Sequence, residues 1–153
     1  MDTVVDEIRN AVTVLKLPQD AMRLLPDSQS LEVFNSALNR FVSGGDRAWW
    51  WESFREPGVS VQFNHGDGWK HIPHIAPDED EKVWFVAEES ALPHYPVFET
   101  TPRVASEVIS QCYAFEYYLI AQDMSWLICE THHNVVCAIG PAVEARLVRE
   151  NAV

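Results

Sequence analysis

The chain has 153 residues, a length that fits a single domain. Its 23 acidic and 11 basic residues give a formal net charge of −12, which repels phosphate groups and excludes nucleic acids and anionic membranes as expected partners. The first residues are acidic where a signal peptide is basic, and the apolar runs are far too short to span a membrane. We therefore expect a soluble, cytoplasmic protein.

The first part of the chain predicts three helices. Apolar residues at helical spacing predict an amphipathic helix over residues 3–16. Pro18 and Pro26 bracket a second, short helix over residues 19–25. Ser30 is a good N-cap for a third helix, whose apolar stripe continues to Phe41.

The middle of the chain alternates between extended and irregular segments. Residues 59–63 alternate apolar and polar side chains, which predicts a half-buried strand, and residues 64–81 predict a loop-rich stretch. Residues 82–87 predict a buried strand, residues 90–100 an irregular segment with two prolines, and residues 101–112 a helix.

The last part of the chain carries the strongest strand signal. Three aromatic and β-branched runs, over residues 113–121, 125–131 and 134–139, predict an antiparallel meander before a final helix over residues 142–150. Helices and strands are segregated along the chain. We therefore expect one α+β domain over residues 1–153, in which N-terminal, central and C-terminal helices pack a mainly antiparallel sheet of about five strands.

Four segments resemble an uncharacterised family of small acidic bacterial proteins. The family's usual segments are WWWE, KVWFI, YAFEYY and SWLLCENHH, and this chain has WWWE at 49–52, KVWFV at 82–86, YAFEYY at 113–118 and SWLICETHH at 125–133. The resemblance covers residues 47–140, and Thr131 stands where the family often has asparagine. Size, charge and α+β order are also similar to the SUKH superfamily of immunity proteins, a fold-level likeness that implies toxin binding.

Glu130, His132 and His133, with Glu116 on the neighbouring predicted strand, form the strongest candidate for chemistry. Imidazoles and carboxylates bind metals and transfer protons. Adjacent residues on a strand point to opposite faces, however, so neighbouring histidines rarely chelate one ion. We favour a hairpin corner whose imidazoles bond nearby groups, and solvent-facing strand carboxylates explain the two glutamates equally well.

His65, His71 and His74 form a second group, in which His71 and His74 have a helical spacing. Pro73 and the nearby glycines argue against a helix at this position, so we favour a loop of solvated histidines. No cysteine pair completes a zinc site, and we expect neither a metal nor another cofactor.

Nucleophilic catalysis has no support, because the chain lacks a GxSxG elbow and a glycine-rich phosphate loop. Cys112, Cys129 and Cys137 lie in apolar segments, which should raise the thiol pKa values and leave the three side chains reduced, buried and inert.

The tryptophan run at 49–51 and the acidic loop at 78–81 are the candidate binding surface. Three consecutive tryptophans cannot all face one core, and an exposed tryptophan is a typical hot-spot residue, although packing at the end of the sheet explains the run more simply. The candidate partner-binding residues are Trp49, Trp50, Trp51, Asp78, Glu79, Asp80 and Glu81. We expect a protein-binding protein, specifically a bacterial immunity protein that neutralises a toxin or effector by occlusion. The alternative is an enzyme or a metal- or small-ligand-binding domain that uses Glu130, His132 and His133.

Overall fold

The computed structural model describes residues 3–43, 50–63, 67–89, 94–112 and 115–151. The strands within these ranges are β1 (Arg23–Leu24), β2 (Val59–Gln62), β3 (Val83–Ala87), β4 (Val97–Thr100), β5 (Tyr117–Ala121), β6 (Leu127–Glu130) and β7 (Val135–Ile139). The α-helices are α1 (Val4–Val14), α2 (Asp27–Phe41), α3 (Ile72–Ile75), α4 (Pro102–Ile109) and α5 (Pro141–Asn151), and the 3-10 helices are η1 (Trp50–Glu52) and η2 (Gly68–His71).

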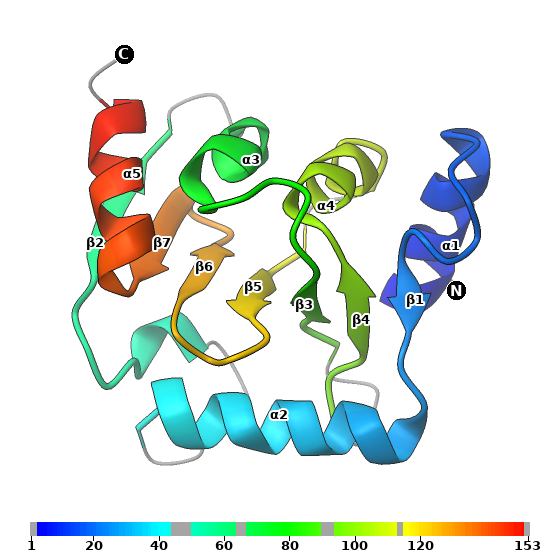
Figure 1. Ribbon diagram of the computed structural model, residues 1–153, viewed down its shortest axis with the longest axis horizontal. Coiled ribbons are helices and arrows are strands. Elements are labelled where there is room, and N and C mark those ends of the chain that lie inside the picture. The colour runs from blue at the N-terminus through cyan, green and yellow to red at the C-terminus, as the bar shows by residue number, and fades with distance from the viewer. Residues whose placement is uncertain (1–2, 44–49, 64–66, 90–93, 113–114, 152–153) are drawn as a thin grey trace.

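These strands form one sheet in the order β1-β4-β3-β5-β6-β7-β2. Every neighbouring pair is antiparallel, which confirms the predicted α+β class. Helix α2 covers one face of the sheet, and α1, α3, α4 and α5 cover the other (Figure 1). No helix in the described part of the chain is long and apolar enough to cross a membrane.

The sheet contributes side chains to two hydrophobic cores. Val86 and Tyr118 pack in the core beneath α2, whereas Phe85 and Leu119 pack in the core beneath the other four helices. This division follows from the alternation of side chains along a strand. Because helices cover both faces, β5 is buried along its whole length.

Most predicted elements are confirmed. Thr3 caps α1 in a capping box with Asp6, and Thr101 caps α4 by accepting a hydrogen bond from the backbone N–H of Val104. The predicted strands at 59–63, 82–87, 125–131 and 134–139 correspond to β2, β3, β6 and β7. The strand predicted over 113–121 is confirmed from Tyr117 onward, and residues 113–114 lie outside the described residues.

The predicted short helix over residues 19–25 is wrong. Arg23 and Leu24 form β1 and pair with β4, and the backbone N–H of Leu25 donates to the carbonyl of Val97 over 2.9 Å. These long-range hydrogen bonds replace those of a helix too short to be stable between two prolines. Ser30 is also not an N-cap, because α2 begins at Asp27 and the Ser30 hydroxyl, inside the helix, accepts a hydrogen bond from the Val97 N–H.

Two further expectations are corrected. Residues 97–100 form β4 rather than an irregular segment, so the described sheet has seven strands instead of about five. Pro73 does not prevent a helix, because it lies in the first turn of α3, where its missing N–H would have no partner within the helix.

Gly140 joins β7 to α5, and we predict that Gly140→Ala destabilises the fold. Its φ of 113° is unfavourable for an L side chain, and a Cβ would lie 2.6 Å from the carbonyl oxygen of Ser125. We expect the free energy of unfolding to fall by about 2 kcal/mol or more, measured by urea denaturation. Ala142→Ser, on an exposed position of α5, is the control and should change it by less than about 0.5 kcal/mol. An equal effect of the two substitutions would contradict the prediction.

Candidate functional site

Two glutamates face each other at one end of the central strand pair. Ala87 and Tyr117 form the last residue pair between β3 and β5, so Glu88 and Glu116 lie opposite one another one step beyond it. The backbone N–H of Glu88 donates to the carbonyl of Glu116 over 2.9 Å. Only 8% of Glu116 is exposed. The fold thus buries a carboxylate beside a second carboxyl group.

The Glu116 carboxylate binds side chains from three other segments. Its Oε2 accepts a hydrogen bond of 2.7 Å from the Trp51 indole N–H, and its Oε1 pairs with Nδ1 of His132. Its third partner is Glu88, which accepts a hydrogen bond of 2.6 Å from the Tyr95 hydroxyl.

The hydrogen bonds of Glu116 lower its pKa by more than its burial raises it. Burial raises the pKa of Glu116, but the bonds from Glu88, His132 and Trp51 together hold it below its ordinary value. A hydrogen bond between two carboxyl groups needs one proton, so Glu88 and Glu116 titrate as a pair. The site therefore contains two neighbouring carboxyl groups joined by a hydrogen bond.

Trp51, His132 and His133, together called the Trp51 patch, lie beside the buried Glu116 carboxylate. Both imidazole rings lie edge-on to the Trp51 indole at 5.7 Å, and their own centroids are 4.0 Å apart. The histidines are exposed, whereas Trp51 is half-buried. They do not point to opposite faces because they lie in the turn between β6 and β7, where strand alternation no longer applies. The predicted hairpin corner is confirmed.

The tryptophan run is divided between core and surface. Trp50 is fully buried, its backbone N–H donates to the Tyr118 hydroxyl over 3.0 Å, and the two rings lie 4.6 Å apart. The indole N–H of Trp50 has no hydrogen-bond partner among the described residues. Trp51 is the half-buried member of the run, and Trp49 lies outside the described residues.

Glu130 is not part of this cluster. Its Oε1 accepts a hydrogen bond of 2.8 Å from Tyr117, which belongs to the core on the opposite face of the sheet from α2. A Cβ at Gly68 would lie 2.9 Å from Glu130 Oε2, so the glycine leaves room for the carboxylate. Burial raises the pKa of Glu130. The structure therefore does not bring Glu130 together with His132 and His133, and neither Glu116 nor Glu130 is a solvent-facing carboxylate.

The second histidine group is dispersed. His71 stacks on Phe63 with ring centroids 4.4 Å apart, and its Nδ1 lies 3.0 Å from Oε1 of Glu150. His74 is exposed, and His65 lies outside the described residues. Across the described ranges, no group of three or more His, Cys, Asp and Glu side chains is arranged to hold a metal ion.

The acid run, Asp78, Glu79, Asp80 and Glu81, lies at the other end of β3 from the Trp51 patch. It precedes Val83, whereas Glu88 follows Ala87, so the length of the strand, about 17 Å, separates the two regions. Arg103 bonds Glu79 at 2.7 Å and Asp80 at 2.9 Å. The acid run and the tryptophan run are therefore two separate places on the molecule.

Sequence reasoning missed Glu88 and Tyr95. Glu88 directly follows a predicted strand, and a correct register between that strand and the one containing Tyr118 would have placed it opposite Glu116. Tyr95 gave no such signal, because it lies in a segment predicted to be irregular.

One cysteine departs from the predicted rise in thiol pKa. Burial raises the pKa of Cys112 to about 11 and that of Cys129 well above its ordinary value. A hydrogen bond with the Cys129 thiol lowers the pKa of Cys137 to about 7. Burial acts in the opposite direction, and a hydrogen bond of 3.2 Å from the Ser60 hydroxyl acts in the same direction as Cys129. All three are free thiols, but only Cys129 is fully buried. The apolar sequence around Cys137 does not indicate these partners on the neighbouring strands.

The comparisons with known proteins identify a family whose function is unknown. A family model described as a family of unknown function, DUF6756, matches residues 2–151. No curated protein and no solved structure matches the chain. The expectation of an uncharacterised family is confirmed at this level and extends over nearly the whole chain.

Glu116 and Glu130 should affect stability with opposite signs. A carboxyl group with a lowered folded-state pKa stabilises the fold above its unfolded-state pKa, and this contribution is lost as the pH falls through the folded value. A raised folded-state pKa favours the fold at low pH, and that contribution is lost as the pH rises through the folded value. At pH 7, Glu116→Gln should lower the free energy of unfolding by about 1–3 kcal/mol, and Glu130→Gln should raise it.

Urea denaturation of both variants from pH 3 to pH 8 tests this pair of predictions. Both differences from wild type should shrink as the pH falls, because the native carboxyl groups become protonated. A destabilising Glu130→Gln at pH 7, or a Glu116→Gln deficit that does not depend on pH, would show that the charges are not responsible.

Cys137 should be the most reactive thiol of the folded protein. At pH 8 its low pKa makes it largely a thiolate, whereas Cys112 and Cys129 stay protonated. Alkylation followed by peptide mass spectrometry should show Cys137 modified first, and Ser60→Ala should slow this reaction. Faster labelling of Cys129 would contradict the prediction.

Proposed function

Because the chain belongs to the DUF6756 family, whose function is unknown, we propose a function from its geometry: it binds a protein partner through the Trp51 patch. The specific form of this proposal is an immunity protein that neutralises a toxin or effector by covering its surface. The observation that carries the proposal is the Trp51 indole, half-buried and held by the buried Glu116 carboxylate.

This arrangement supports binding because it fixes the contact residues before a partner arrives. Glu116 holds the Trp51 indole by one oxygen and the His132 imidazole by the other, and the His133 ring packs against both of these rings. Side chains that are already ordered lose little conformational entropy on association. Tryptophan is also among the residues most enriched in binding hot spots. The patch therefore has the properties of a binding anchor.

The charge of the chain indicates the kind of partner. A net charge of −12 attracts basic surfaces and accelerates their encounter. The acid run adds to this field from the other end of β3, although Arg103 compensates part of its charge. We infer a basic partner, steered by the whole field and retained by the Trp51 patch.

A proton-transfer or small-ligand site at the same place is the second candidate. It is favoured by the adjacent carboxyl groups of Glu88 and Glu116 and by the buried indole N–H of Trp50, which has no hydrogen-bond partner among the described residues. An ionised carboxylate bonded to an exposed histidine is also an arrangement used in general acid–base catalysis. In that case Glu88→Gln should abolish activity on a small molecule and leave partner binding intact.

Trp51→Ala should weaken partner binding mainly by speeding dissociation. The partner is first captured from a lysate of the native host and purified, and its binding is then measured by surface plasmon resonance. We expect the dissociation rate to rise about 30-fold, which corresponds to the hot-spot threshold of about 2 kcal/mol. Neutralising the acid run to Asn and Gln should lower only the association rate, and mainly at low salt.

Trp84→Ala is the matched control. Trp84 is also half-buried and lies on the same strand as Ala87, but at the end away from the Trp51 patch. Trp84→Ala should lower the free energy of unfolding without changing the dissociation rate of the partner. Equal dissociation rates for wild type and Trp51→Ala, with the fold intact by circular dichroism, would refute the proposed surface. If the partner is a toxin, co-expression should protect cells, and Trp51→Ala should weaken the protection.

A further inference from the structure

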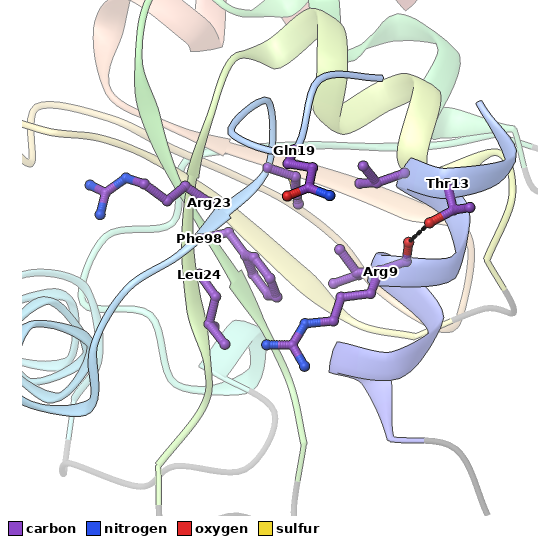
Figure 2. A pocket seen from close by; sticks show the side chains of 9 residues that line it. Arg9, Thr13, Gln19, Arg23, Leu24 and Phe98 are labelled. Carbon is purple, nitrogen blue, oxygen red and sulfur yellow. Dashed lines mark hydrogen bonds between the residues drawn. The ribbon is translucent and has the colours of Figure 1, made fainter. Parts of the chain in front are cut away.

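A cavity of about 410 Å³ lies between α1 and the β1–β4 edge of the sheet, on the opposite face of the sheet from α2 (Figure 2). Its apolar floor consists of three buried side chains, Ile8, Met22 and Phe98. The remaining lining residues are Arg9, Val12, Thr13, Gln19, Arg23 and Leu24. The volume falls within the usual range for small-molecule pockets, roughly 300–1,000 Å³.

The charge of this lining is opposite to that of the whole chain. The protein has 23 acidic and 11 basic residues, yet the charged lining residues of the cavity are both arginines. A cation beside an apolar floor favours a ligand with an anionic head and an apolar body.

The two arginines differ in their availability. Nη2 of Arg23 lies 3.0 Å from Oε1 of Glu99, and in Figure 2 its guanidinium points away from the cavity. Arg9 extends from α1 toward Leu24 and Phe98 in the same view. None of the ion pairs in the described part of the chain involves Arg9. The Arg9 guanidinium is therefore the one able to receive an anionic head.

We propose that this cavity binds a small amphipathic anion, namely a medium-chain carboxylate. The carboxylate accepts hydrogen bonds from the Arg9 guanidinium, and the hydrocarbon chain covers Met22 and Phe98. This proposal is independent of the Trp51 patch, which involves other elements of the fold.

A second cavity provides an internal comparison. It has a volume of about 320 Å³, lies beside α2, and is lined by Glu32, Trp84 and Met124 among other residues. Its one charged lining residue is acidic, so a carboxylate should avoid it. Met22 lines the first cavity and Met124 the second, so each cavity contains its own methyl reporter.

The test is a titration of full-length protein, ¹³C-labelled at the methionine methyl groups, with octanoate. The Met22 methyl resonance should shift in a saturable manner while the Met124 resonance stays fixed. Arg9→Gln should weaken octanoate binding about tenfold or more, as expected for a charged hydrogen bond. Arg23→Gln should change it much less. Both arginines are exposed, so both variants should keep the wild-type melting temperature.

Octylamine and octanol separate charge from apolar contact. We expect octanol to bind more weakly than octanoate and octylamine to leave Met22 unchanged. Three results would each overturn the proposal: no octanoate shift at Met22, equal shifts at Met22 and Met124, or equal affinity of wild type and Arg9→Gln. Binding of octylamine as tight as that of octanoate would also overturn it.

Discussion

The antiparallel pairing of β3 with β5 is the constraint on which both the cores and the candidate site depend. The register places Phe85 opposite Leu119 and Val86 opposite Tyr118, so each pair contributes to a different core. A slip of one residue would move every side chain of the strand to the wrong face. The same register brings Glu88 and Glu116 together beyond the last pair of the ladder. Packing of the cores and geometry of the site therefore have a single cause.

Two carboxylates on neighbouring strands show how much the immediate partners matter to a buried charge. The hydrogen bonds of Glu116 lower its pKa by more than burial raises it. The hydrogen bond from the Tyr117 hydroxyl also lowers the pKa of Glu130, but burial raises that pKa by more. Burying a charge is unfavourable unless its partners restore the lost hydration. The polar end of the β3–β5 pair is thus stabilised by the same contacts that order Trp51 and His132.

The sequence predicted the elements that carry a regular pattern and missed those that depend on distant partners. Periodicity identified α1, α2 and the meander of β5, β6 and β7, because burial of one or two faces leaves a repeating signal. β1 and β4 are short, lie next to prolines and exist through their pairing with each other and with β3. No local pattern in Arg23–Leu24 indicates a strand.

The sequence predicted the residue types of the candidate site but not their arrangement. Glu116 and His132 were identified by residue type, and the hairpin corner by its polar link. Their pairing, the separation of Glu130 and the distance between the acid run and Trp51 follow from strand register and from turn geometry. The lowered pKa of Cys137 likewise depends on Ser60 and Cys129, residues on two neighbouring strands.

The shortness of β1 has a consequence for self-association. This strand forms one edge of the sheet with only two residues, and Pro18 and Pro26 lie close on either side of it. An edge strand offers unpaired backbone groups to a strand of another molecule, and such templating is a common route to aggregation. Two residues supply too few of these groups to hold an added strand, and proline has no N–H to contribute. This edge of the sheet is therefore protected from the growth of intermolecular β-structure.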